Sequence, residues 1–225
     1  MVATTRSVFD HQLDVLRDNV LYLSEFVIDQ VQQATRALRE RDVATARHVD
    51  TFDADINRMR YEIEEQCYTL LALQQPNSHD MRRIVATVSV VTNLERMGDH
   101  AAGIARLALR MEAAGCHILI GEFDNMAEIA VANLRDAMTA LATEDKILAR
   151  AVVSRDAEID DLHKAVYDRL IRQMAEDTST VECATMMLWV SHNLERYADR
   201  ISNICERIIY LVTGELHKQR ADSMP

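Results

Sequence analysis

Residues that form turns are scarce in this chain, and this scarcity constrains its fold more than any other feature. The 225 residues include five glycines and two prolines, whereas these two residue types make up about 12% of an average protein. A β-sandwich or an alternating α/β fold needs a turn about every dozen residues. The supply here is sufficient only for a few long helices with short connections, and we therefore predict an all-α fold.

Apolar residues recur at intervals of three and four, which is the period of one face of a helix. The pattern is clearest from Met187 to Val212, where only the polar Ser191 interrupts the apolar stripe. The pattern and the positions of the turn residues predict six helices, over residues 7–39, 42–74, 78–113, 122–143, 145–175 and 179–213.

Residues that favour helix ends support these boundaries. Pro76 follows the second predicted helix, and Gly214 lies where a C-cap glycine belongs. Asp42 and Asp145 provide N-caps directly after the preceding helices, so those neighbouring helices are expected to fold back as hairpins.

The charge balance bears on possible partners. Acidic residues outnumber basic residues by 36 to 25, which gives a net charge of −11. A nucleic-acid backbone is repelled by such a chain unless a local basic patch outweighs the field, and the longest basic clusters are pairs such as Arg82-Arg83. We therefore exclude nucleic acid as a partner and expect cations. The sequence has neither a signal peptide nor an apolar run of about 20 residues, which predicts a cytoplasmic protein.

Four cysteines are spread widely along the chain: Cys67, Cys116, Cys183 and Cys205. They form no CxxC pair. We therefore predict buried, reduced thiols rather than disulfides or a zinc site.

An internal repeat divides the chain. The segment 93–99, Asn-Leu-Glu-Arg-Met-Gly-Asp, recurs at 193–199 with five of its seven residues unchanged. Upstream, 53–57 matches 156–160, and both pairs of segments lie about 100 residues apart. Two similar three-helix halves are predicted.

Each repeated motif places two oxygen-bearing side chains four residues apart, on one face of a helix. The pairs are Glu95/Asp99, Glu195/Asp199, Asp156/Asp160 and Asp53/Asn57. Like charges at this spacing repel each other, and two such pairs on facing helices outline a site for a compensating cation. Oxygen ligands favour hard or borderline ions such as Mg²⁺, Mn²⁺ or iron. The alternative is that the acids form an ordinary solvated face.

Other candidate residues are less informative. Arg96 and Arg196 are either surface ion-pair partners or clamps that orient the carboxylates. Asp160 and His163 form one carboxylate-x-x-His step, but bundle di-iron enzymes need two such steps and further glutamates. The remaining histidines, including His192, are interpreted as surface or helix-end residues, and no catalytic motif is present.

Taken together, these motifs resemble the PhoU family. The resemblance rests on the two Leu-Glu-Arg-x-x-Asp blocks, on the Asp-x-x-Ile-Asn/Asp signatures before them, and on the segment 67–76 followed by Asp80-Met81-Arg82. It covers about residues 7–214. It implies two pseudo-symmetric antiparallel three-helix bundles, here residues 1–114 and 115–225, and a homodimer.

The resemblance also implies that the acidic motifs bind divalent or trivalent metal ions, either iron, Mn, Mg or Zn, often in multinuclear clusters. Carried over by position, the first site uses Asp53, Asn57, Glu95 and Asp99, and the second uses Asp156, Asp160, Glu195 and Asp199. Because Asn57 is neutral where Asp160 is charged, the first site is expected to be the weaker one.

For function, the resemblance implies a cytoplasmic accessory protein between the ATPase subunit of the phosphate ABC transporter and the phosphate-sensing histidine kinase. Such a protein reaches the membrane only through its partners and keeps the starvation response off when phosphate is plentiful. A non-enzymatic, metal-binding regulator is therefore the leading hypothesis. A carboxylate-bridged metalloenzyme and a purely structural scaffold are the alternatives.

One element is present in the first half only. Asp80 and Arg82 have no counterpart in the second half, where Val181-Glu182-Cys183 takes the equivalent position. This asymmetry favours contact with a partner, although an acid at a helix N-terminus beside an arginine also fits ordinary capping.

Overall fold

The computed structural model describes residues 2–73, 76–116 and 121–215, and the regular structure in this part of the chain is helical, without strands. The predicted all-α fold is thus confirmed. The helices are α1 (Val2–Glu40), α2 (Val43–Leu73), α3 (Ser78–Ala113), α4 (Glu122–Thr143), α5 (Lys146–Val153), α6 (Asp156–Glu176) and α7 (Val181–Thr213), with a 3₁₀ turn, η1 (Thr178–Thr180), before α7. The predicted end of the second helix, residue 74, lies outside the described residues. None of the described helices is long and apolar enough to span a membrane.

One predicted helix is divided. The sequence pattern predicts a single helix over 145–175, but the structure has two segments, α5 and α6, separated by Ser154 and Arg155. The Ser154 hydroxyl donates to the carbonyl of Ala151 at 2.7 Å, and the Arg155 amide bonds the carbonyl of Val152, three residues back, at 3.0 Å. The Glu158 amide likewise bonds the carbonyl of Arg155, three residues back, so bonds of the 3₁₀ type locally replace the α-helical ladder between α5 and α6.

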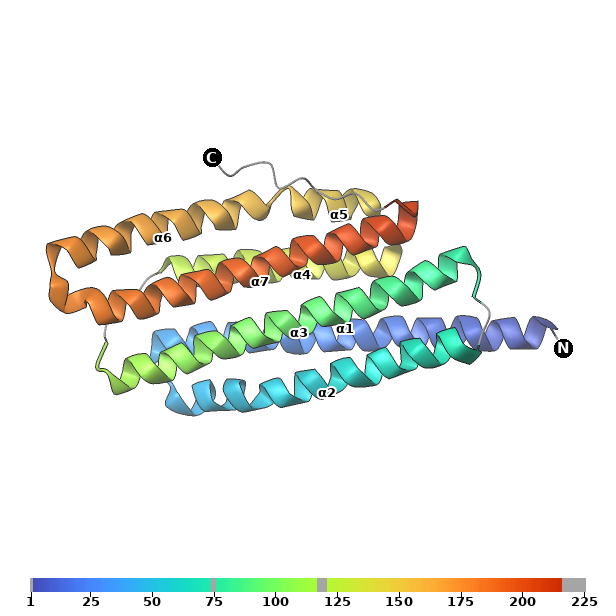
Figure 1. Ribbon diagram of the computed structural model, residues 1–225, viewed down its shortest axis with the longest axis horizontal. Coiled ribbons are helices and arrows are strands. Elements are labelled where there is room, and N and C mark those ends of the chain that lie inside the picture. Colours follow the sequence, from blue (N-terminus) through green and yellow to red (C-terminus); the bar gives the residue numbers. More distant parts are fainter. Residues whose placement is uncertain (1, 74–75, 117–120, 216–225) are drawn as a thin grey trace.

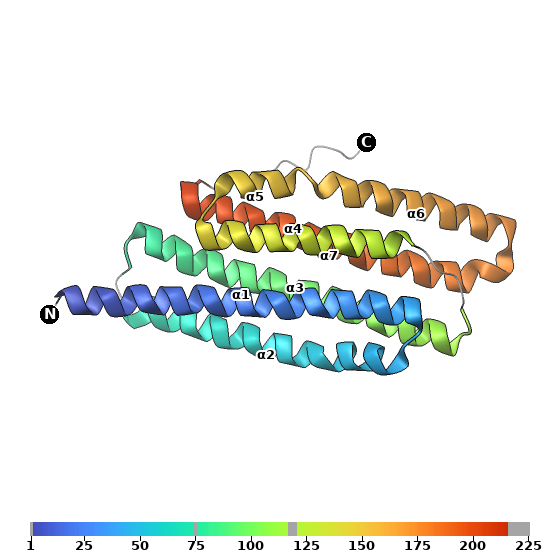
Figure 2. The same ribbon diagram turned by 180° about the vertical axis from the view of Figure 1, so that it is seen from behind.

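The helices form two three-helix bundles that lie side by side (Figures 1 and 2). The first bundle consists of α1, α2 and α3, and the second of α4, α7 and the divided helix α5–α6. The long helices α3 and α7 meet in the middle of the molecule, and α1 contacts α4 beside them. This arrangement confirms the predicted pair of antiparallel bundles.

Caps hold the helix ends where the sequence predicts them. The Asp42 side chain accepts from the amides of Ala44 and Thr45, and the Asp145 side chain accepts from the second and third amides of α5. Gly214 ends α7 with a φ of 75°, a left-handed conformation that glycine adopts without strain.

Small residues allow α3 and α7 to approach each other closely. A Cβ atom added to Gly103 would lie 2.9 Å from Oδ1 of Asn193, so a larger residue at position 103 would force the Asn193 side chain to move. The same Asn193 oxygen lies 3.2 Å from Nδ1 of His100. Ala101 and Ala102 on α3 are fully buried. The contact between the two repeated helices is therefore tight and includes polar groups.

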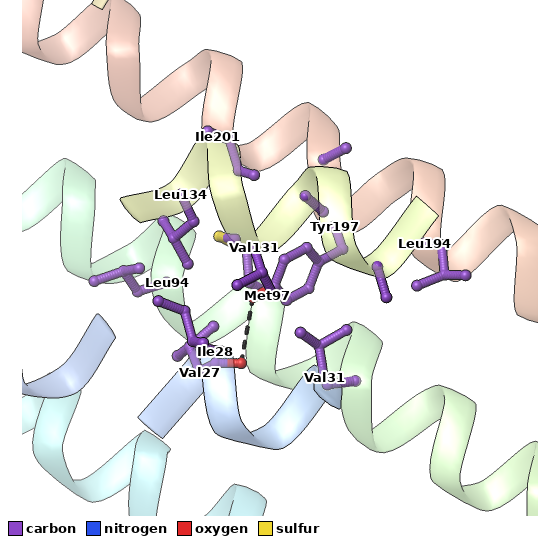
Figure 3. Close-up of a cluster of buried hydrophobic side chains, with 14 of the residues drawn as sticks. Val27, Ile28, Val31, Leu94, Met97, Val131, Leu134, Leu194, Tyr197 and Ile201 are labelled. Carbon is purple, nitrogen blue, oxygen red and sulfur yellow. Dashed lines mark hydrogen bonds between the residues drawn. The ribbon is translucent and has the colours of Figure 1, made fainter. Parts of the chain in front are cut away.

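Tyr197 links the two bundles through the core. Its side chain is fully buried on α7, among apolar residues of α1, α3 and α4 (Figure 3). Its hydroxyl donates to the carbonyl of Val27 on α1 at 3.2 Å. Burial raises the pKa of this phenol. A single side chain thus contributes both apolar contacts and a hydrogen bond to the contact between the halves.

The cysteine prediction is half wrong. Cys67 and Cys205 are buried free thiols, as expected, and burial raises the pKa of each to about 12. Cys116 and Cys183, however, form a disulfide with their Cα atoms 5.6 Å apart. These two cysteines are 67 residues apart in the sequence. The bundle places the residue that follows α3 against the first turn of α7, and their spacing in the sequence does not reveal this proximity.

Truncation of Tyr197 should be costly. We expect Tyr197→Ala to lower the free energy of unfolding by about 3–5 kcal/mol, because it leaves a cavity between the bundles. Tyr197→Phe should cost about 1 kcal/mol, because only the hydrogen bond is lost. Urea unfolding followed by circular dichroism measures both. The exposed Tyr68 offers a control: Tyr68→Phe should change stability by less than about 0.5 kcal/mol, and equal effects at the two tyrosines would contradict the assigned role of Tyr197.

The disulfide can be tested by thiol counting. Protein isolated without reductant, then unfolded and treated with iodoacetamide, should gain two alkyl groups, one each on Cys67 and Cys205. Prior reduction should raise the count to four, and mass spectrometry reads the difference. Four additions without reductant would show that Cys116 and Cys183 are not bonded.

Candidate metal centres

The two sets of acidic residues come together as their spacing predicts. Burial and the negative charge of Asp99 raise the pKa of Asp53 on α2 and of Glu95 on α3, so these three acids lie near one another. Asn57 donates to Oδ2 of Asp53 at 3.4 Å. We call this set the first acidic site.

The second acidic site is its counterpart between α6 and α7. Burial raises the pKa of Asp156 and Asp160 on α6 and of Glu195 on α7, and the negative charge of Asp199 on α7 adds to each shift. The seven acidic residues among the eight predicted ligands therefore lie in two groups whose charges repel one another.

Several of these carboxylate oxygens are buried without a hydrogen bond. In the described residues, Asp53 Oδ1, Glu95 Oε2 and Glu195 Oε2 are inaccessible to solvent and accept no hydrogen bond. The Glu95 side chain is only 6% exposed. A buried, unpaired carboxylate oxygen is unfavourable, and nearby like charges add to the cost. Burial, followed by the charge of Asp99, contributes most to the raised pKa values of Asp53 and Glu95.

Arginines from the repeated motifs contact the same carboxylates. Arg96 donates to Asp99 at 2.9 Å and its Nε lies 3.5 Å from Glu95 Oε2, while Arg196 donates to Asp199 at 2.8 Å. In the first site, Arg60 of α2 adds a second guanidinium, 3.5 Å from Glu95 Oε1. Arg96 and Arg196 are thus placed to orient the carboxylates, and they are also partly exposed.

The donor chemistry fits a hard or borderline cation. Within the described ranges, no three His, Cys, Asp or Glu side chains are arranged to hold a metal ion as they stand. The buried oxygens of Glu95 and Glu195, which accept no hydrogen bond, are nevertheless the atoms whose charge a cation would neutralise. Binding therefore requires the side chains to rotate and the arginines to release part of their contacts.

Asp80 and Arg82 have intramolecular partners. Asp80 is buried, 3% exposed, and accepts from Nη1 of Arg6 at 2.7 Å. Arg82 donates from Nε to the carbonyl of Leu211, near the end of α7, at 3.1 Å. These contacts join the N-terminal part of α1 and the end of α7 to α3, and they leave Asp80 little surface to offer a partner.

Two histidines that the sequence analysis set aside as ligands lie beside the second acidic site. His163 of α6 lies 2.8 Å from the Ser191 hydroxyl, measured from Nδ1, and His192 of α7 lies 3.5 Å from Glu195, measured from Nδ1 to Oε2. The signal was available in the spacing, because His163 follows Asp160 by three residues and His192 precedes Glu195 by three. The step from Asp160 to His163 was set aside because bundle di-iron enzymes need two such steps, and His192 was interpreted as a surface residue, in agreement with its exposed side chain.

Comparison with known proteins identifies the family. A model described as the PhoU domain matches residues 20–108 and 123–208. The chain belongs to the PhoU family. A PhoU homolog of Clostridium acetobutylicum, described as a phosphate-specific transport system accessory protein, is 35% identical over 212 residues, which cover 94% of this chain and 97% of the relative. A PhoU homolog from Caulobacter vibrioides with the same description is 32% identical over 216 residues, which cover 96% of this chain and 94% of the relative.

Solved PhoU structures have the same fold. The crystal structure of the phosphate transport system regulatory protein PhoU from Streptococcus pneumoniae gives a TM-score of 0.87 at 32% identity, over 93% of this chain and 99% of that one. The crystal structure of PhoU from Pseudomonas aeruginosa gives a TM-score of 0.87 at 32% identity, over 92% of this chain and 100% of that one. The family resemblance drawn from the motifs is thereby confirmed, and so is the fold that it implies.

Glu195 should make metal-free protein sensitive to pH. Burial and the neighbouring Asp199 raise its pKa from 4.5 to about 7. Between these values the folded state keeps a proton that the unfolded chain has released, so stability falls as the pH rises from about 4.5 through 7. Glu195→Gln should therefore flatten the decline in urea midpoint between pH 5 and 8, measured in the presence of a chelator.

A matched control is Glu158→Gln, at an exposed glutamate of the same bundle, which should leave the decline unchanged. A Glu195→Gln profile that is superimposable on the wild-type profile would contradict the raised pKa. The acids Asp53, Glu95, Asp156 and Asp160 share the same direction of shift, so part of the decline should survive in the variant.

Proposed function

We propose that this PhoU-family chain is a non-enzymatic, metal-binding regulator that acts as an accessory protein of phosphate-specific transport. The observation that carries the proposal is the repeat of one unusual feature. Glu95 on α3 and Glu195 on α7 occupy equivalent positions, and each has a buried oxygen without a hydrogen-bond partner among the described residues. If the acids only formed a solvated surface, equivalent carboxylate oxygens of the two halves would not both be buried.

The proposed ligands are the eight residues of the two acidic sites: Asp53, Asn57, Glu95 and Asp99 in the first, and Asp156, Asp160, Glu195 and Asp199 in the second. Their oxygen donors suit Mg²⁺, Mn²⁺, iron or Zn²⁺. A bound ion supplies positive charge between two helices. It would connect α2 to α3 in one bundle and α6 to α7 in the other.

The proposed mode of action is through surfaces rather than through a chemical step. The relatives' description as accessory proteins of the phosphate-specific transport system supports a place beside that transporter. The family resemblance supports its ATPase subunit and a phosphate-sensing histidine kinase as partners in the cytoplasm, a homodimer, and repression of the starvation response when phosphate is plentiful.

The metal part of the proposal can be measured directly. Protein purified without a chelator and without a metal-affinity tag should contain metal, determined by elemental mass spectrometry. Replacing Glu195 and Asp199 by alanine should remove the metal of the second site and leave that of the first, because the sites lie in different bundles. Replacing the exposed acids Glu158 and Asp168 by alanine provides a control of equal charge change. Unchanged metal content in the Glu195/Asp199 variant would refute the ligand assignment.

The regulatory part of the proposal has to be tested in living cells. A strain that lacks its own copy of this protein and is grown in ample phosphate should express a phosphate-starvation reporter at a high level. The wild-type chain should repress the reporter, and the Glu195/Asp199 double-alanine variant should repress it less. A wild-type chain that fails to repress while folded and metal-loaded would separate metal binding from the regulatory role.

A further inference from the structure

Two histidines stand at one end of the second acidic site. His163 lies one helical turn after Asp160 on α6, and His192 lies one turn before Glu195 on α7. The two helices are neighbours. The rings of His163 and His192 come within 6.5 Å of each other, centroid to centroid. The second site is thus not made of oxygen donors alone.

The surroundings of both rings are those of positioned ligands. Nδ1 of His163 lies 2.8 Å from the hydroxyl of Ser191, which is fully buried and is the polar residue that interrupts the apolar stripe of α7. A ring nitrogen engaged in this way fixes the orientation of an imidazole and leaves Nε2 to bind an ion. Nδ1 of His192 lies 3.5 Å from Glu195 Oε2, the buried oxygen without a hydrogen-bond partner.

The first acidic site differs at both equivalent positions. By the offsets of the repeat, Arg60 stands where the second half has His163, and Thr92 stands where it has His192. The guanidinium of Arg60 lies 3.5 Å from Glu95 and 2.9 Å from Glu64, so the chain's own positive charge is already next to the first site. The Thr92 hydroxyl donates to the carbonyl of Val88 in its own helix.

We propose that His163 and His192 provide nitrogen ligands beside Glu195 and Asp160, and that they make the second site selective for a borderline divalent transition-metal ion over Mg²⁺. Imidazole favours ions such as Zn²⁺ and Co²⁺, whereas an all-oxygen set suits Mg²⁺. This inference rests on the proposed function, in which the acidic motifs bind metal. Because the described side chains do not yet form a closed ligand set, binding draws the two rings together by rotation of their side chains.

A built-in reporter lies beside this site. Trp189 is the chain's single tryptophan, it is 56% exposed, and its ring meets the ring of His192 edge-on at 5.7 Å. An open-shell ion bound to His192 would sit close enough to quench the indole fluorescence. Quenching therefore reports occupancy of the second site without any assay of function.

The test is a titration of metal-free, full-length protein with Co²⁺, followed by Trp189 fluorescence and by isothermal calorimetry, and a parallel calorimetric titration with Mg²⁺. We expect saturable quenching by Co²⁺. His163→Gln and His192→Gln should each raise the Co²⁺ dissociation constant about tenfold or more and should leave the Mg²⁺ constant within about twofold. His11→Gln, at an exposed histidine of α1, serves as the matched control and should change neither constant.

The outcomes separate the inference from the proposed function. Co²⁺ binding that survives both histidine variants but is lost in a Glu195→Gln, Asp199→Asn double variant would overturn the histidine assignment and leave the carboxylate sites standing. Equal weakening of Co²⁺ and Mg²⁺ by the histidine variants would overturn the selectivity. A wild-type chain that binds neither ion would overturn both proposals. Far-ultraviolet circular dichroism of each variant shows whether it is folded.

Discussion

The close packing of α3 against α7 is the contact on which the rest of the molecule depends. Gly103 leaves room for the Asn193 side chain at this contact. Because α3 and α7 each use one face for this contact, their other faces are available to pack against the helices of their own bundle. The acidic motifs of α3 and α7 consequently turn toward α2 and α6, and each acidic site is assembled inside one bundle rather than between the two. The position of the carboxylates therefore follows from apolar packing.

A large apolar core offsets the destabilising repulsion among those carboxylates. Half-buried acids with raised pKa values destabilise the metal-free fold at neutral pH. Stabilisation comes from the many fully buried aliphatic side chains and from Tyr197, which joins the halves. Arg60, Arg96 and Arg196 reduce the repulsion in part. A protein built in this way tolerates acidic sites that would unfold a smaller bundle.

Local features of the chain were predictable from the sequence, and long-range ones were not. The caps at Asp42 and Asp145 and the close approach at Gly103 depend on residue type and helical spacing, which the sequence displays directly. The disulfide at Cys116 depends on a proximity created by the bundle. Asp80 looked like a surface residue because its partner, Arg6, lies 74 positions away. The break between α5 and α6 is a local change from bonds four residues back to bonds three residues back, which apolar periodicity does not register. The acidic sites were predictable because each motif occurs in both halves, whereas the proximity of His192 to His163 was not, because the two residues lie on different helices.

The repeat also has a consequence that two separate subunits could not match. In a symmetric dimer every substitution appears at both sites, so the two sites stay alike. Here both copies lie on one chain, and each can diverge alone: Arg60 and Thr92 in one half stand against His163 and His192 in the other. Divergence gives the two halves different chemistry around a similar arrangement of three helices. A partner that contacts both halves would therefore meet a different set of side chains on each, and could bind the molecule in one orientation only.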